Sequence, residues 1–160
     1  MNGNFELERK KSESRARYML RQLSGLNIME IYSGDKTEEY FSEKYSRYIE
    51  HWHKGLTASS KFPIDSDERE LYNWLLAEIG AEIGSEYVFI IPLNDRVNAA
   101  KIKINDVFDA INSLWNHRKF FGEKYYSRGF ILIDTVNNKL IDAGSDSGDE
   151  LNYQIYIWNY

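Results

Sequence analysis

GFILIDTVNNKLID, residues 129–142, is the stretch that decides the fold. Its two halves, Gly129–Asp134 and Lys139–Asp142, are apolar and rich in β-branched residues, and Val136-Asn137-Asn138 between them is typical of a turn, so the stretch predicts a β-hairpin. The alternating segment Tyr153-Gln154-Ile155-Tyr156-Ile157-Trp158 predicts a further strand that closes the sheet. Its outer edge could recruit a second copy of the chain into a homodimer.

Upstream of this region the sequence predicts mainly helices. Apolar residues at helical spacing and capping residues indicate four of them. They span about 5–23, 35–53 with Asp35 or Thr37 as the cap, 65–83 capped by Asp65 or Ser66, and 105–117 capped by Asn105 or Asp106. Residues 87–91 predict a buried strand, and residues 26–32 fit either a strand or a helical turn. Residues 94–103 fit either a loop or an edge strand. We expect loops at 57–63 and 144–150. The order predicts one α+β domain over 1–160, with N-terminal helices packed on a C-terminal, mainly antiparallel sheet.

Composition narrows the class of protein. The 160 residues are 42% hydrophobic and contain no cysteine, so we expect one packed core without disulfides or cysteine metal sites. The longest apolar run, 87–91, is far shorter than the ~20 residues that span a bilayer. The N-terminus shows no basic segment followed by an apolar run. We therefore expect a cytoplasmic protein with no membrane association.

Charge favours a basic partner. The net charge is −5, with +3 in residues 1–24 and −8 in the remainder. An acidic body repels phosphate backbones, so we do not expect nucleic-acid binding. The alternative is a regulatory protein that contacts nucleic acid through Lys10, Arg17 and Arg21 of the basic first helix.

Two acidic clusters are candidate partner-binding surfaces. Glu78 and Glu82, with Glu86 at the same step, are expected to form a stripe on the third helix. The other cluster comprises Asp142, Asp146, Asp149 and Glu150 in and beside a Gly/Ser-rich loop. A solvated face is the simplest interpretation of either cluster, and a surface for a basic protein is the next. The loop lacks the residue order of a calcium-binding EF-hand, so we expect no metal.

Histidines and nucleophiles give no catalytic pattern. His51 and His53 flank Trp52 on a predicted helix, where residues two apart face different directions, and His117 is the third histidine. We expect all three to be partly exposed helical side chains. The sequence contains no Gly-x-Ser-x-Gly elbow and no phosphate loop. We therefore expect neither an enzyme nor a cofactor, with a small metal-dependent enzyme that uses Glu78, Glu82, His51 or His53 as the alternative.

Aromatic residues suggest both a core and an interface. Phe41, Tyr45, Tyr48 and Trp52 share one predicted helix face and are expected to pack in the core. The connection 120–126 between a helix and a strand carries four further aromatic side chains, which are candidate interface anchors because a connection cannot bury them all easily. They are Phe120, Phe121, Tyr125 and Tyr126.

The helix at 65–83, the aromatic connection at 120–126, and the acidic segment 142–150 before a Tyr/Trp-rich last strand together resemble a known group. In overall character the chain is similar to the cytoplasmic immunity proteins of bacterial polymorphic toxins, including contact-dependent growth inhibition systems. The resemblance implies binding of a cognate toxin or effector domain and neutralisation of its activity. Because that group is structurally diverse, no functional residue transfers by position.

Overall fold

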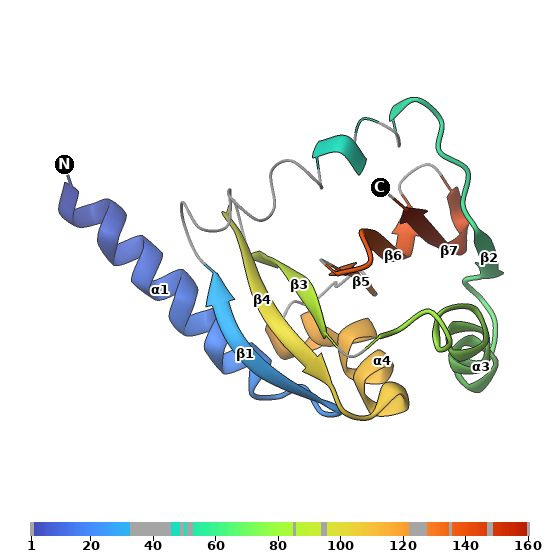
Figure 1. The fold of residues 1–160 in the computed structure, drawn as a ribbon, viewed down its shortest axis with the longest axis horizontal. Coiled ribbons are helices and arrows are strands. Elements are labelled where there is room, and N and C mark those ends of the chain that lie inside the picture. The colour runs from blue at the N-terminus through green and yellow to red at the C-terminus, as the bar shows by residue number, and fades with distance from the viewer. Residues whose placement is uncertain are drawn as a thin grey trace.

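The computed structural model describes residues 2–32, 46–48, 50, 53–84, 86–93, 96–121, 128–134, 136–146 and 149–159. Figure 1 shows the helices and strands of this fold. Their bounds are α1 Asn2–Leu20, β1 Leu26–Tyr32, β2 Ser60–Pro63, α3 Glu68–Ile79, β3 Glu86–Leu93, β4 Arg96–Ile104, α4 Val107–Trp115, the 3-10 helix η1 His117–Phe121, β5 Gly129–Asp134, β6 Lys139–Asp146 and β7 Asp149–Asn159.

A seven-stranded sheet organises the protein, in the order β1-β4-β3-β5-β6-β7-β2. Every pair of neighbouring strands is antiparallel. The predicted hairpin is present: β5 and β6 pair from Gly129↔Gly144 to Asp134↔Lys139. Helices mostly precede the C-terminal strands, which confirms the predicted α+β class.

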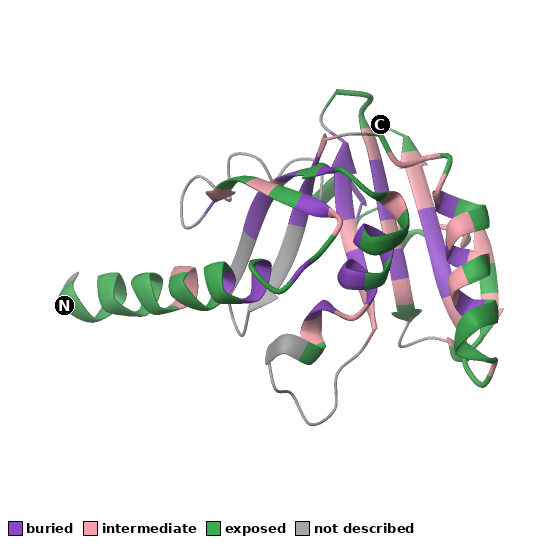
Figure 2. Cartoon of the chain, turned by 90° about the horizontal axis from the view of Figure 1, so that it is seen from below, coloured by how far each residue is buried: buried purple, intermediate pink, exposed green. Residues whose placement is uncertain are grey.

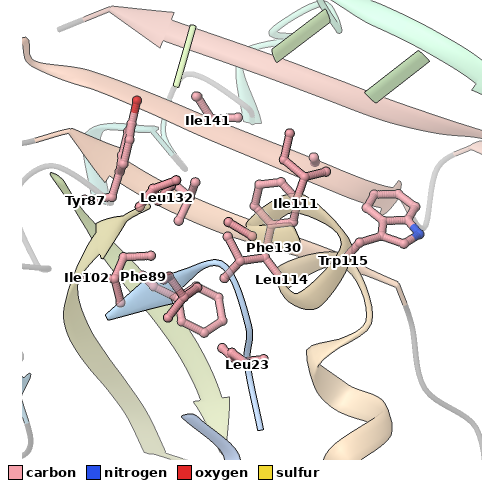
Figure 3. Packing of buried hydrophobic residues seen from close by; sticks show 14 of the residues in the cluster. Leu23, Tyr87, Phe89, Ile102, Ile111, Leu114, Trp115, Phe130, Leu132 and Ile141 are labelled. Carbon is pink, nitrogen blue, oxygen red and sulfur yellow. The ribbon is translucent and has the colours of Figure 1, made fainter. Parts of the chain in front are cut away.

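Alternation along the strands divides the apolar residues between the two faces of the sheet. Phe89, Leu132 and Ile141 point to one face, where they join the buried residues of α1, α3 and α4 in the main core. Their sequence neighbours Val88, Ile133 and Leu140 point to the other face. Figure 3 shows Ile111, Leu114 and Trp115 of α4 packed with Phe130 and Leu132 of β5. One layer of helices therefore covers one face of the sheet.

Tyr48 covers part of the opposite face. Its side chain is 1% exposed and packs with Tyr156 and Leu140 in a second cluster. Its ring centre lies 6.1 Å from that of Trp158. The core position predicted for Tyr48 is confirmed, whereas Phe41, Tyr45 and Trp52 lie outside the described residues.

A carboxylate holds the β5–β6 turn. Asp134 accepts hydrogen bonds from the backbone amides of Val136 and Asn137 and from the Asn137 side chain, at 2.8–2.9 Å. Asn138 completes the turn at φ 52°, a left-handed conformation that asparagine tolerates well. Burial raises the pKa of Asp134, but the bonds from Asn137 and Val136 and the charge of Lys139 outweigh it and hold that pKa below its usual value.

Capping residues set the helix limits. Asp106 accepts the Asp109 amide at 2.9 Å and begins α4, as predicted. The N-cap of α3 is Asp67 rather than Asp65 or Ser66, because the Asp67 carboxylate is the group that accepts the Arg69 amide. Gly25 follows α1 at φ 75°, and its carbonyl accepts the Asp106 amide at 3.0 Å. This glycine therefore links the end of the first helical region to the start of α4.

Several segments that were predicted as loops, or for which a strand was one of two alternatives, are strands. Residues 26–32 form β1, and residues 96–104 form β4, an interior strand between β1 and β3 rather than an edge. The predicted loop at 144–150 is largely the end of β6 and the start of β7, with Asp146 opposite Asp149. Strand pairing supplies the order that the polar composition of these segments did not indicate.

The last strand is not the edge that we expected. β2, in the predicted loop 57–63, pairs with β7 from Ser60↔Ile155 to Pro63↔Asn152. The expected free edge at 153–158 is therefore wrong over residues 153–155, and the reason for expecting dimerisation there is removed. The N-terminal half of α1 instead projects beyond the sheet, and Figure 2 shows it as exposed.

Candidate protein-binding surface

Two residues with exposed apolar side chains, Ile64 and Leu151, are joined through their backbones where the pairing of β2 and β7 ends. The backbone amide of Ile64 donates to the Leu151 carbonyl at 2.9 Å and extends the β2–β7 ladder by one residue. Leu151 is 77% exposed and Ile64 is 37% exposed. Rigid backbone therefore presents two aliphatic side chains to solvent.

Acidic residues adjoin this pair in sequence. Asp65 follows Ile64, Glu150 precedes Leu151, and Asp67 caps α3 two residues farther on; all three are exposed. We refer to Ile64, Asp65, Asp67, Glu150 and Leu151 as the Ile64–Leu151 surface. It combines two exposed aliphatic side chains with three exposed carboxylates close to them in sequence, a composition that suits a basic protein.

Asp149 connects the two segments of this surface through hydrogen bonds. Its carboxylate accepts from Lys61 Nζ at 2.9 Å and from the side chains of Asn152 and Gln154, and its Oδ1 accepts from the Leu151 amide. Hydrogen bonds from Lys61 and then Asn152 lower the pKa of Asp149 to about 2. The carboxylate thus joins β2 to the start of β7.

The Trp74 side chain of α3 holds β2 from the helix side. Trp74 Nε1 donates to Ser60 Oγ at 2.8 Å, and the Trp74 ring stacks on Phe62 with a centroid distance of 5.1 Å. Figure 1 shows β2 beside α3 at the end of the sheet away from α1. The surface is therefore anchored to both the sheet and α3.

The predicted acidic loop divides into structural and exposed members. Asp142 is partly buried and accepts a 2.7 Å hydrogen bond from the Tyr48 hydroxyl, so it packs inward instead of forming a patch with the others. Asp149 is committed to the contacts above, and the backbone of Asp146 pairs opposite it. Among the three members whose side chains the structure describes, Asp142, Asp149 and Glu150, only Glu150 is exposed.

The expected glutamate stripe is wrong, because α3 ends at Ile79. Glu78 is exposed on the helix, but Glu82 lies beyond the helix end and pairs with Lys139 of β6. Glu86 begins β3, where it pairs with Lys101 of β4 at 3.4 Å. The helix stop at Gly80 therefore separates three carboxylates that a longer helix would align.

The aromatic connection is described only in part. Phe120 and Phe121 belong to η1, while Tyr125 and Tyr126 lie outside the described residues. His51 also lies outside them, and His53 is exposed as expected.

His117 is buried, which corrects the expected partial exposure. It is 1% exposed, its ring meets Phe89 edge-on at 5.1 Å, and its Nδ1 lies 2.7 Å from the Leu114 carbonyl oxygen. Burial is the main cause that lowers the pKa of His117 to about 4. The neutral ring donates from Nδ1 to that carbonyl and serves the core.

Comparison with protein-family models, curated protein sequences and solved structures finds no match. Across the described residues, no group of three His, Asp or Glu side chains is placed to hold a metal ion. The same part of the chain contains no helix long and apolar enough to cross a membrane. The Ile64–Leu151 surface is thus a candidate on the strength of its own residues.

Sequence reasoning missed Ile64, Asp65, Asp67 and Leu151 as members of one surface. Local sequence gives only polar segments around 64–67 and 149–152, far apart in the chain. Their proximity depends on the β2–β7 register. The available signal was Leu151, a single apolar residue within a polar, acidic stretch.

Proposed function

We propose that the protein is an immunity-type inhibitor that binds a basic toxin or effector domain and neutralises it. The observation that carries the proposal is the Ile64–Leu151 surface, where two exposed aliphatic side chains from paired segments are next in sequence to exposed carboxylates. Aliphatic side chains at the centre of an interface contribute affinity, and surrounding charges steer association with a partner of opposite sign. The acidic body, −8 over residues 25–160, extends the same attraction over a longer range.

Rigidity supports this proposal. Asp149, Lys61 and Trp74 hold the surface in place before any partner arrives. A preordered surface loses little conformational entropy on binding, so more of the contact energy appears as affinity. Inhibition by occupation of a partner's active site needs tight binding and no chemistry from the inhibitor.

The test begins with products of neighbouring genes in the native host, co-purified with the tagged chain and tested for a 1:1 complex by light scattering. Affinity is then measured for Leu151→Arg and for the double variant Asp65→Lys/Glu150→Lys. We expect Leu151→Arg to weaken binding by about 30-fold, the effect of losing one central interface anchor. The charge variant is expected to slow association and to reduce its dependence on salt.

Two matched controls separate this surface from general exposure and charge. Val136→Arg changes an apolar residue that is 76% exposed at the β5–β6 turn, and Glu30→Lys reverses an exposed acid on β1. Both should bind as the unchanged protein does. Equal losses in the controls and the surface variants, or a 1:1 partner that binds all variants alike, would overturn the proposal.

A further inference from the structure

A polar hollow of about 480 Å³ lies between α3 and the C-terminal end of α4. Segments distant in sequence converge on it and contribute Ser24, Tyr72, Asn112, Asn116, Lys119 and Arg128. Its lining contains hydroxyl, amide and charged groups and no aliphatic side chain. It shares no residue with the Ile64–Leu151 surface, so a ligand bound in the hollow would use different residues from those that we propose for the toxin partner.

A hydrogen-bond network orients the amides in the hollow. The Tyr72 hydroxyl donates to Asn112 Oδ1 at 2.7 Å and accepts from Asn116 Nδ2. Asn116 Nδ2 also donates to the carbonyl and the Oδ1 of Asn112, both at 3.1 Å. These acceptors fix the orientation of the Asn116 amide. If it were rotated by 180°, its oxygen would face the oxygen atoms of Tyr72 and Asn112 and could not donate to them.

The network leaves polar atoms available for a ligand. Within the described residues, the Asn112 Nδ2 donor and the Asn116 Oδ1 acceptor have no hydrogen-bond partner. An available donor on Asn112 and an available acceptor on Asn116, whose side-chain amides are hydrogen-bonded to each other, match the hydroxyl groups of a sugar or polyol, which both donate and accept. Because Tyr72 holds both amides in place, little order has to be created on binding.

The lining of the hollow includes two cations, Lys119 and Arg128, and one carboxylate, Glu68, so its net charge is positive within an acidic protein. Lys119 is exposed and has no ion pair within the described part of the chain. Arg128 contacts Glu68 at 3.3 Å, but the Glu68 side chain is 62% exposed, and such a pair is weak enough to exchange partners. The guanidinium fork of arginine and the ammonium of lysine are the groups that commonly bind phosphate.

We propose that this hollow binds a small phosphorylated ligand that carries hydroxyl groups, of the sugar phosphate or mononucleotide class. Lys119 and Arg128 bind the phosphate, and the amides of Asn112 and Asn116 bind the hydroxyl groups. A cavity of this volume accommodates a ligand of that size. The hollow gives the protein a small-molecule site in addition to its protein-binding surface.

The experiment is a nuclear magnetic resonance titration of the full chain, with ribose 5-phosphate, ribose and inorganic phosphate each added up to about 10 mM. We expect ribose 5-phosphate to shift the side-chain amide signals of Asn112 and Asn116 and to bind more tightly than either fragment. Lys119→Ala should weaken ribose 5-phosphate at least about tenfold, the loss of one charged hydrogen bond. Lys103→Ala, which removes an exposed lysine of β4, should have no effect.

Tyr72→Phe tests the role of the network. Without the hydroxyl the two amides lose their common partner, so we expect the preference for ribose 5-phosphate over inorganic phosphate to decrease while phosphate itself still binds. Absence of saturable shifts at Asn112 and Asn116 with all three compounds would overturn the proposal. Equal weakening by Lys119→Ala and Lys103→Ala would also overturn it, since binding would then follow overall charge. Neither result depends on whether a toxin partner binds the Ile64–Leu151 surface.

Discussion

Lys61 Nζ of β2 lies 2.9 Å from Asp149 Oδ2 of β7, and this ion pair joins the shortest strand of the sheet to the longest. The same carboxylate accepts the Leu151 amide and the side chains of Asn152 and Gln154. Asp149 therefore organises the strand ends that present the Ile64–Leu151 surface.

Asp149→Ala should loosen β2 without unfolding the sheet. The backbone amides of Ser59 and Ile64, which donate to β7 carbonyls at 2.7 and 2.9 Å, are expected to exchange with solvent at least about tenfold faster. Glu150→Ala, at the exposed neighbour, should leave both exchange rates unchanged. Because the pKa of Asp149 is lowered to about 2, its contribution is complete above the usual aspartate pKa and is lost only as the pH falls towards 2. Unchanged exchange in Asp149→Ala at neutral pH would contradict this role.

Tyr48→Phe should destabilise the fold by about 1–2 kcal/mol. The substitution removes the hydroxyl that donates to Asp142 at 2.7 Å and leaves a partly buried carboxylate without that donor. Urea denaturation at pH 7 measures the difference. Tyr18→Phe is the control, because the Tyr18 side chain is 64% exposed on α1. A loss as small as that of the control would show that the Tyr48–Asp142 bond contributes nothing net.

Stability should fall as the pH drops from 6.5 to 4, through His117. The pKa of this buried side chain is lowered from 6.5 to about 4, so the unfolded chain takes up a proton before the folded one does. The free energy of unfolding does not depend on His117 above pH 6.5. Below that pH it decreases, and near pH 4 it is lower by about 3 kcal/mol. Denaturation of the unchanged protein and of His117→Leu at pH 7 and pH 4.5 checks this. The variant should lose less stability between the two pH values than the unchanged protein does.

Gly25→Ala should destabilise the protein by more than 1 kcal/mol. Gly25 adopts φ 75°, which side-chain-bearing residues rarely take, and an added Cβ would lie 2.4 Å from the Ala110 amide nitrogen. Thermal unfolding measures the loss, with Gly55→Ala as the control. Gly55 has a similar φ of 89°, and no atom of the described residues lies within 4 Å of an added Cβ, so the control reports mainly the backbone strain. Equal losses in the two variants would show that the contact with α4 does not matter.

The hairpin, the strand at 87–91 and the Asp106 cap were predictable because each depends on residues close in sequence. Two apolar segments with turn residues between them can form few other structures, and a capping carboxylate acts on amides within its own turn. The α+β class follows from the order of such local elements.

β2, β4 and the candidate surface were not predictable in the same way. Ser60–Pro63 is a strand because Asn152–Ile155 lies opposite it, and nothing near residue 60 in the sequence indicates that partner. Arg96–Ile104 alternates weakly, yet pairing on both sides makes it an interior strand. Asp142 and Asp149 are visible in the sequence as charges, but Tyr48, which donates to Asp142, is 94 residues away, and Lys61, which pairs with Asp149, is 88 residues away. Long-range partners decide whether a carboxylate faces a ligand or its own protein.

The two outer strands of the sheet, β1 and β2, are the first two strands in the chain, and their partners β4 and β7 follow much later. During synthesis from the N-terminus, both edges emerge from the ribosome before the interior strands that they must join. β2 can pair with β7 only after Asn152–Ile155 has left the exit tunnel. The β2–β7 pairing, and with it the neutralising surface proposed above, therefore forms among the last contacts of this sheet.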